Sequence, residues 1–323
     1  MKKDATTIMK RYENNPILDV KDFPGIAQLY NPSVVKYNDE YVMLVSTVEF
    51  ASRLSYGGTV ARGTTKIARS KDGYHFELDY NDFISFDSVP KEWHKSEIYC
   101  HFIDNRVTKI DDTYYIITPV CVDCGFMGPV GMLGKTKDFK TYEAIDIITQ
   151  PSNRGASLFP EKINEKYFKL DRPGAGAQGG CIWISASHDL IHWGEYKPVI
   201  APGYQFWNET KMGPTPPIKT DKGWLVIVHG VWVPAGGKQY YIGAILLDLE
   251  EPWKVIGKTN SYLIAPEMPY ELHGTSDNSP FPCGALADYE NDKLILYYGG
   301  CDKYICRADG KLSDIINACI EQI

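Results

Sequence analysis

One aspartate and a group of basic residues stand at equivalent places in a repeated pattern of this sequence. Asp104 opens the second copy of the pattern. The basic residues lie within or just upstream of the third and fourth copies: Arg154, Arg172, Lys211 and His229. A carboxyl group with a raised pKa can act as a general acid, and clustered cations attract anionic groups. These residue types predict a site for a polar, anionic or sugar-like ligand, with Asp104 as the candidate acid.

The elements that must position these residues are five copies of a short hairpin. Each copy is a strand, a tight polar turn and a second strand that is apolar and rich in aromatic residues. The copies cover residues 31–46, 104–119, 159–173, 216–230 and 281–300. One hairpin in each blade-sized unit predicts an all-β fold, a five-bladed β-propeller that forms a single domain over residues 1–323. Because the innermost strands of a propeller surround its axis, the hairpin ends opposite the turns become neighbours.

These axial ends carry further polar residues: Asn31 and Ser46 in the first copy, Arg106 beside Asp104 in the second, Tyr298 and the following Asp302 in the fifth, and Asn278 just upstream of the fifth. Nearby aromatic side chains that can stack on sugar faces are Tyr99, Trp207, Trp224, Trp232, Tyr240 and Tyr241. Two structural alternatives stay open. Arg106 can pair with Asp104 inside its own blade, and His229, which ends an apolar run, can be a satisfied core histidine.

A second motif follows each of the first three hairpins and supplies the outer strands of a blade. It recurs as Ser70/Asp72/Phe76, Thr136/Asp138/Tyr142 and Ser187/Asp189/Trp193. An aspartate at the start of a turn accepts backbone N–H groups two residues on. We therefore interpret these acids as turn residues rather than as calcium ligands, which must come in larger sets. The fifth unit differs, because residues 304–320 begin as a strand and end as a short amphipathic helix.

Composition and charge exclude several classes of function. The chain has 323 residues and a net charge of −7, so it lacks the broad basic field of a nucleic-acid or membrane-surface binder. No apolar run approaches the roughly 20 residues that span a bilayer, and the N-terminal residues lack the apolar core of a secretory signal. We expect a cytoplasmic protein with reduced thiols. The spacing of Cys121 and Cys124 lacks the second ligand pair of a zinc site.

Several ordered blocks resemble glycoside hydrolase family 130, the β-mannoside phosphorylases and mannosidases. The strongest are LYNPSVVKYNDEY, FIDNRVTKIDDTYYI, NRGASLFPEKINEKYFKLDRP, FWNETKMGPTPPIKTDKGWLVIVHG and FPCGALADYENDKLILYYGGCD. The resemblance implies a five-bladed propeller that uses no metal or organic cofactor, with inorganic phosphate as co-substrate. It implies inverting phosphorolysis of a β-mannooligosaccharide or a mannosyl-glucose to α-mannose 1-phosphate and a shortened acceptor. A homo-oligomeric assembly is compatible with it.

The same resemblance implies roles for single residues. Asp104 matches the general acid, although Asn105 replaces the proline that usually follows it. The matching phosphate-binding residues are Arg154, Arg172, Lys211 and His229, and the matching sugar-binding residues are Asn31 and Asp302. From their places beside the hairpin ends we also expect Arg106 and Asn278 to bind the sugar and Trp207 to shape the acceptor side. One position departs from the pattern. Ser46 stands where an arginine is usual, and Arg53 or Arg62 are its candidate replacements.

Two rival functions follow from the same residues. An inverting hydrolase needs a second carboxylate that activates water, for which Glu209 and Glu161 are the candidates. A sugar-binding propeller without catalysis would tolerate the loss of Asp104. A single axial acid beside several cations favours the phosphorylase, because phosphate is already an anionic nucleophile and needs no base.

Overall fold

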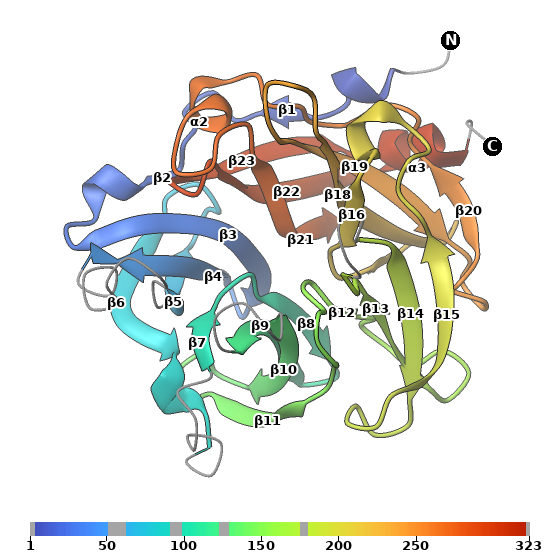
Figure 1. Ribbon diagram of the computed structural model, residues 1–323, viewed down its shortest axis with the longest axis horizontal. Coiled ribbons are helices and arrows are strands. Elements are labelled where there is room, and N and C mark those ends of the chain that lie inside the picture. Colours follow the sequence, from blue (N-terminus) through green and yellow to red (C-terminus); the bar gives the residue numbers. More distant parts are fainter. Residues whose placement is uncertain (1–3, 51–62, 91–98, 123–128, 175–179, 321–323) are drawn as a thin grey trace.

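The computed structural model describes residues 4–50, 63–90, 99–122, 129–174 and 180–320. Within these ranges, antiparallel strands form five blades around a central axis (Figure 1). The predicted five-bladed propeller is confirmed, and each predicted hairpin forms the inner part of one blade. The turns are tight because Asn38 and Asp111 adopt positive φ angles of 51° and 54°, a backbone conformation that Asn and Asp tolerate.

The first three blades follow one another along the chain. Blade 1 contains β3 (Ile26–Tyr37), β4 (Glu40–Glu49), β5 (Gly63–Ser70) and β6 (Glu77–Ile84). Blade 2 contains β8 (Arg106–Ile110), β9 (Thr113–Val122), β10 (Pro129–Thr136) and β11 (Glu143–Ile147), with β7 (Tyr99–Phe102) beside β9. Blade 3 contains β12 (Ser157–Leu158), β13 (Tyr167–Asp171), β14 (Ile182–Ser187) and β15 (Gly194–Ile200).

The last two blades close the ring. Blade 4 contains β16 (Lys211–Pro214), β17 (Ile218–Lys219), β18 (Trp224–Trp232), β19 (Gln239–Leu247) and β20 (Val255–Lys258). Blade 5 contains β21 (Pro280–Asp288), β22 (Lys293–Gly300) and β23 (Tyr304–Lys311), and its outer edge is β1 (Lys10–Arg11) and β2 (Leu18–Asp19). The short helix α2 (Pro269–Leu272) precedes β21, and α3 (Leu312–Ile320) confirms the predicted C-terminal helix. The N-terminal edge strands were not predicted.

The repeated aspartates are turn residues, as interpreted from the sequence. Asp72 Oδ1 accepts the backbone N–H groups of Tyr74 at 2.8 Å and His75 at 2.9 Å. Asp138 and Asp189 accept the equivalent pairs of N–H groups in blades 2 and 3. Their carboxylates are occupied by the backbone. Cys124, the second thiol of the C-x-x-C spacing, lies outside the described residues.

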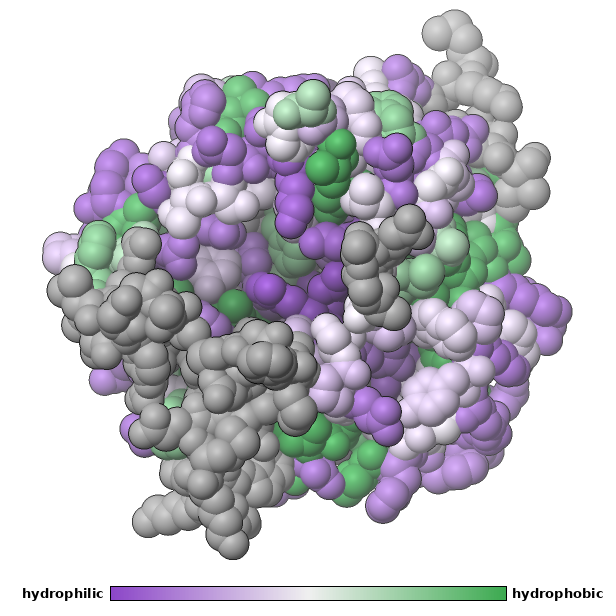
Figure 2. All heavy atoms as spheres, viewed as in Figure 1, coloured by the Kyte–Doolittle hydropathy of each residue, from purple (hydrophilic) through white to green (hydrophobic). Residues whose placement is uncertain are grey.

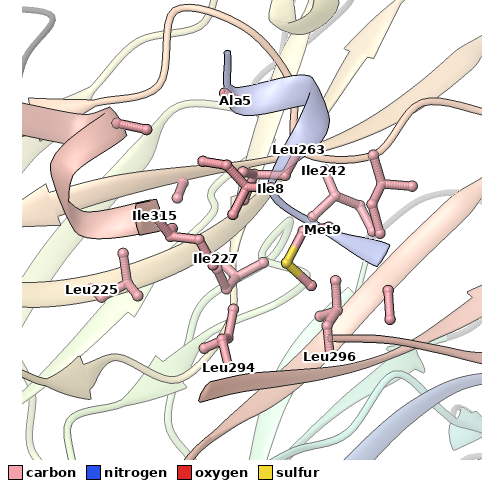
Figure 3. Packing of buried hydrophobic residues seen from close by; sticks show 14 of the residues in the cluster. Ala5, Ile8, Met9, Leu225, Ile227, Ile242, Leu263, Leu294, Leu296 and Ile315 are labelled. Atoms are coloured by element: carbon pink, nitrogen blue, oxygen red, sulfur yellow. The ribbon is translucent and has the colours of Figure 1, made fainter. Parts of the chain in front are cut away.

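Apolar clusters join each blade to the next. One cluster fills each of the five junctions, from Val35, Leu44 and Val107 between blades 1 and 2 to Leu29, Val34 and Tyr297 between blades 5 and 1. Figure 3 shows the cluster between blades 4 and 5, where Ile227 and Leu296 pack with Ile8 from the N-terminal segment and Ile315 from α3. These sheets and clusters fix the inner hairpins around the axis. Among the described residues no helix is long and apolar enough to cross a membrane.

Candidate active site

A polar cavity of about 180 Å³ lies where the inner hairpins end at the axis. Figure 2 shows hydrophilic side chains gathered in this central hollow. The lining residues are Asn31, Asp104, Arg154, Arg172, Lys211, Tyr240, Ser276, Ser279, Phe281 and Asp302. The structure therefore brings together the candidate acid, three of the four predicted basic residues, and Asn31 and Asp302. Ser276, Ser279 and Phe281 were missed, although they flank the predicted Asn278 in sequence.

Asp104 is fully buried and held from several sides. Asn31 Nδ2 donates to its Oδ1 at 2.6 Å, and Arg154 Nε donates to its Oδ2 at 2.6 Å. The backbone of Asp104 has φ 56°. Its N–H donates to Ser46 Oγ at 2.8 Å, and its carbonyl accepts a bond from Arg106. Asp104 thus has one fixed orientation in the cavity wall.

The ionisation of the two cavity carboxyls differs. Burial alone would raise the pKa of Asp104, but the charges of Arg154 and Arg106 and the bond from Asn31 outweigh it and lower that pKa. Burial and the charge of Asp104 raise the pKa of Asp302 to about 6. The free protein therefore does not have the raised pKa that suits a general acid, because the charges of two guanidinium groups outweigh the burial of Asp104. Asp104 is an anion at neutral pH.

Part of the cavity wall is cationic, formed by Arg154, Arg172 and Lys211. Arg172 Nε donates to the carbonyl of Arg154 at 2.6 Å, and Lys211 Nζ donates to the hydroxyl of Tyr240 at 2.9 Å. Burial, together with the charges of Arg172 and Arg154, lowers the pKa of Lys211 to about 7. Burial and the charges of Arg154 and Arg106 lower the pKa of Arg172 to about 10. Crowded cations that depress one another's pKa would be stabilised by a bound anion.

His229 lies in the wall behind these cations rather than on the cavity surface. Its side chain is nearly fully buried, and its ring centroid is 4.5 Å from that of Phe281. Burial and the charges of Arg172 and Lys211 hold the pKa of His229 well below its usual value, so the ring is neutral. Neither ring nitrogen has a hydrogen-bond partner among the described residues. A satisfied core histidine would be buried, as His229 is, but its ring nitrogens would have partners. The predicted role of His229 in phosphate binding stays a prediction.

Arg106 and Asn278, two of the predicted sugar-binding residues, do not line the cavity. Arg106 is 1% exposed and lies beneath it, with its guanidinium carbon 5.8 Å from the Phe281 ring. It donates to the backbone carbonyl of Asp104 within its own blade, rather than forming the ion pair with the carboxylate that the within-blade alternative proposed. Asn278 has φ 54°, and its carbonyl accepts the N–H of Tyr240 at 2.8 Å. Its backbone therefore supports a cavity-lining residue.

Trp207 belongs to the core between blades 3 and 4. It has no exposed surface, and its indole N–H donates to the carbonyl of Asn260 at 3.3 Å. The ring lies so close to Gly230 and Gly243 that a Cβ on either glycine would come within 2.5 Å and 2.3 Å of it. The prediction that Trp207 contacts the acceptor sugar is therefore wrong. Trp207 is close in sequence to Lys211, which lines the cavity, but its own side chain points into the core.

Ser46, the position where an arginine was expected, supports the acid directly. Replacing it by alanine leaves the N–H of Asp104 unpaired and buried, which should lower the free energy of unfolding by about 1–3 kcal/mol. We expect Ser46→Ala to lower kcat as well, because Asp104 loses an anchor of its backbone. Chemical denaturation and steady-state kinetics measure the two effects. Arg53 and Arg62, the proposed replacements for an arginine, lie outside the described residues.

A matched control for Ser46 exists in the same hairpin. Ser33 Oγ accepts the backbone N–H of Val107 at 3.1 Å and is equally buried, so Ser33→Ala removes a similar bond without touching Asp104. We expect it to lower stability to a similar extent and to leave kcat nearly unchanged. Equal losses of kcat in both variants would show that Ser46 has no special effect on the acid.

Comparison with known proteins decides the family. The family model described as beta-1,4-mannooligosaccharide phosphorylase of glycoside hydrolase family 130 matches residues 2–321. The chain belongs to glycoside hydrolase family 130. It is 32% identical over 317 residues to a β-1,4-mannooligosaccharide phosphorylase of Ruminococcus albus, covering 97% of this chain and 91% of that one.

Other members of family 130 are similar in sequence and fold. A β-1,2-mannobiose phosphorylase of Listeria innocua is 36% identical over 255 residues, covering 78% of this chain and 67% of that one. A solved structure of a β-1,2-mannobiose phosphorylase from Listeria innocua, in complex with β-1,2-mannobiose, superimposes with a TM-score of 0.83 at 28% identity, covering 96% of this chain and 98% of that one. The named relatives are thus mannoside phosphorylases that differ in linkage.

Neither Glu161 nor Glu209, the two candidates for a carboxylate that activates water in a hydrolase, lies at the cavity. Glu161 is paired with Lys219 at the surface, and Glu209 is exposed. Among the described lining residues, the second carboxylate is Asp302.

Proposed function

We propose that this protein is an inverting β-mannoside phosphorylase. Phosphate attacks the anomeric carbon of a terminal β-mannoside, and the products are α-mannose 1-phosphate and a shortened acceptor. The observation that carries the proposal is one small cavity in which a buried aspartate faces Arg154, Arg172 and Lys211. Such a cationic wall can gather and aim an anionic nucleophile. The names of the relatives in the family support the same reaction.

Arg154 connects the acid to the proposed phosphate site. In the free protein its guanidinium is bound to Asp104 and lowers the pKa of that carboxyl. A phosphate bound at the cationic wall competes for Arg154 and adds negative charge beside Asp104. Both effects raise the pKa of Asp104, which then takes up a proton from solvent. Asp104 therefore holds the proton that it must donate only when phosphate is bound.

The bond changes then balance without a base. A phosphate oxygen forms the bond to the anomeric carbon as the bond to the leaving oxygen breaks. That oxygen receives the proton held by Asp104, through a sugar hydroxyl as the family resemblance implies. Asn31 and Asp302 face the same cavity and are proposed to hold the mannosyl hydroxyls. The reaction needs no metal or organic cofactor, and phosphate is the co-substrate.

The proposed substrate is a β-mannooligosaccharide or a mannosyl-glucose disaccharide. Relatives are named for β-1,4-linked, β-1,2-linked and mannosyl-glucose substrates, so the family alone does not select a linkage. A cytoplasmic location and a homo-oligomeric state are predictions that accompany this proposal.

Phosphate dependence tests the proposal. β-1,2-mannobiose, β-1,4-mannobiose and mannosyl-β-1,4-glucose are incubated with the protein, with and without inorganic phosphate, and the products are resolved by anion-exchange chromatography. We expect α-mannose 1-phosphate from at least one substrate and no turnover without phosphate. The second cavity carboxylate, Asp302, keeps a hydrolase as the alternative. Release of free mannose at a rate indifferent to phosphate would establish that alternative.

The low pKa of Lys211 predicts that anion binding is linked to proton uptake. Lys211 loses its proton above pH 7 in the free protein, whereas a bound anion favours its charged form. Binding should therefore release or take up no proton at Lys211 well below pH 7, and take up nearly one proton per anion above it. Sulfate is the probe, because it does not titrate in this range. Calorimetry in buffers of different ionisation enthalpy measures the uptake.

The matched variant for this measurement is Lys211→Arg. Arginine keeps the positive charge but does not titrate near neutrality. The part of the proton uptake that belongs to Lys211 should disappear while sulfate still binds, so that only uptake at Asp104 remains. Unchanged uptake in this variant would assign the proton to another group.

A further inference from the structure

The two cavity arginines lie on adjacent segments that are bonded to each other. Asn153 and Pro173 form an antiparallel bridge. Arg172 Nε donates to the carbonyl of Arg154 at 2.6 Å, and the N–H of Arg154 lies 3.4 Å from the carbonyl of Arg172. The Arg172 guanidinium is thus tied to the backbone that carries Arg154. The spacing of the two cations is therefore set by whatever fixes this pair of segments.

Asn153 fixes them from behind the cavity. Its Oδ1 accepts the backbone N–H of Arg172 at 3.2 Å, and its Nδ2 donates to Asp171 Oδ1 at 3.0 Å. The side chain is 8% exposed, and both of its polar atoms are occupied. Asn153 thus joins the segment of Arg154, the backbone of Arg172 and the carboxylate of Asp171.

Asp171 is in turn fixed by a buried ion pair. Lys169 Nζ donates to both of its carboxylate oxygens at 2.6 Å, and Ser185 Oγ donates to its Oδ2 at 2.7 Å. Lys169 and Asp171 are 1% and 3% exposed. A buried ion pair is a weak source of stability but a rigid one when its hydrogen bonds are complete.

This network serves the arginines rather than a ligand of its own. It borders a second cavity of about 350 Å³, which Trp183 and Tyr196 also line. A ligand there would need free polar groups. The side-chain polar atoms of Asn153, Lys169 and Asp171 all have partners inside the network. The network's connections lead to the arginine segments instead.

We propose that Asn153, Asp171 and Lys169 are positioning residues that hold Arg154 and Arg172 at the spacing that phosphate requires. Like charges in the empty cavity repel one another, so the unliganded arginines would spread apart without a rigid support. A site arranged before binding loses less free energy when the anion arrives. The inference rests on the proposed function, because it takes phosphate as the anion.

The test measures phosphate affinity apart from turnover. Inorganic phosphate is titrated into wild type and Asn153→Ala by calorimetry, and KM is measured for phosphate and for the best mannoside. Loss of such a supporting contact weakens ligand binding by about 10–100-fold at metal sites, and we expect a rise in this range in the Kd and KM for phosphate. The KM for the mannoside should change less than about twofold, since the side chain of Asn153 bonds to the Arg172 segment and not to Asn31 or Asp302, the proposed sugar-binding residues.

Two further variants separate positioning from folding. Ser157→Ala removes a buried hydrogen bond of blade 3 to the carbonyl of Pro214, so it controls for general loosening and should leave phosphate affinity unchanged. The double variant Lys169→Met with Asp171→Leu replaces the ion pair by apolar side chains, which buried sites often accept. It should stay folded in thermal melts and bind phosphate as weakly as Asn153→Ala.

The outcomes distinguish this inference from the proposed function. Wild type that binds and uses phosphate, with folded variants of unchanged phosphate affinity, would overturn the inference alone. Wild type that binds no phosphate would overturn the proposed function and the inference with it. An equal rise in the KM for phosphate and in the KM for the mannoside would overturn the inference alone, because the variant would then affect the whole cavity rather than the two arginines.

Discussion

Asp104→Asn is expected to reduce kcat by about 10²–10⁴-fold, the usual contribution of a general acid. Asparagine has nearly the same shape and still meets Asn31 and Arg154, but it cannot deliver a proton to the leaving oxygen. The loss should depend on the leaving group. A 2,4-dinitrophenyl β-mannoside needs no protonation, so with this substrate the variant should approach the wild-type rate. Steady-state assays with mannobiose and with the aryl mannoside measure both.

Asp104→Gly is the companion variant, because the backbone here has φ 56°, a conformation that glycine adopts without strain. It removes the carboxyl and leaves space for a small external acid. We expect formate to restore part of the activity toward mannobiose at low pH. Activity within a few-fold of wild type in Asp104→Asn, with an unactivated substrate, would show that Asp104 is not the acid.

Arg172→Ala is expected to raise the KM for phosphate by about 100-fold. Hydrogen bonds to charged groups contribute about 1.5–3 kcal/mol, and Arg172 also holds the carbonyl of Arg154, so its removal disturbs two cations. The KM for the mannoside should change little, because the sugar side of the cavity is built from blades 1, 2 and 5. Initial rates over a matrix of phosphate and mannoside concentrations separate the two constants.

Arg172→Lys is the control for charge. Lysine keeps the positive charge but lacks the planar fork that binds two phosphate oxygens and the carbonyl together. We expect an intermediate KM for phosphate in this variant. An Arg172→Ala protein with wild-type KM for phosphate would place the nucleophile elsewhere in the cavity.

The repeat placed polar residues at the axis, and the structure shows that several of them share one backbone conformation. Asn31, Asp104, Asn278 and Asp302 all have positive φ angles between 51° and 56°. Asn and Asp are the non-glycine residues that accept this conformation most readily. Three of the four, Asn31, Asp104 and Asp302, line the cavity. The repeat was enough to locate the acid, because it placed these residues at neighbouring hairpin ends.

What the sequence did not predict depends on which way a side chain points and on what surrounds it. Trp207 and Lys211 are close in sequence, yet the indole enters the core and the ammonium lines the cavity. The function of Ser46 follows from its bond to the N–H of Asp104, a contact between blades 1 and 2. The lowered pKa of Asp104 could not be predicted from the sequence, because the approach of Arg154 from blade 3 is a property of the folded ring.

The edge strands of blade 5 have a consequence for how the ring folds. Asn15 Nδ2 donates to the carbonyl of Arg307 at 2.8 Å, a bond across 292 positions of the chain, and Arg11 is paired with the buried carboxylate of Glu271. Such long closures are entropically costly and fold slowly. The N-terminal edge strands are synthesised long before their partner β23, so we expect the ring to close late in folding.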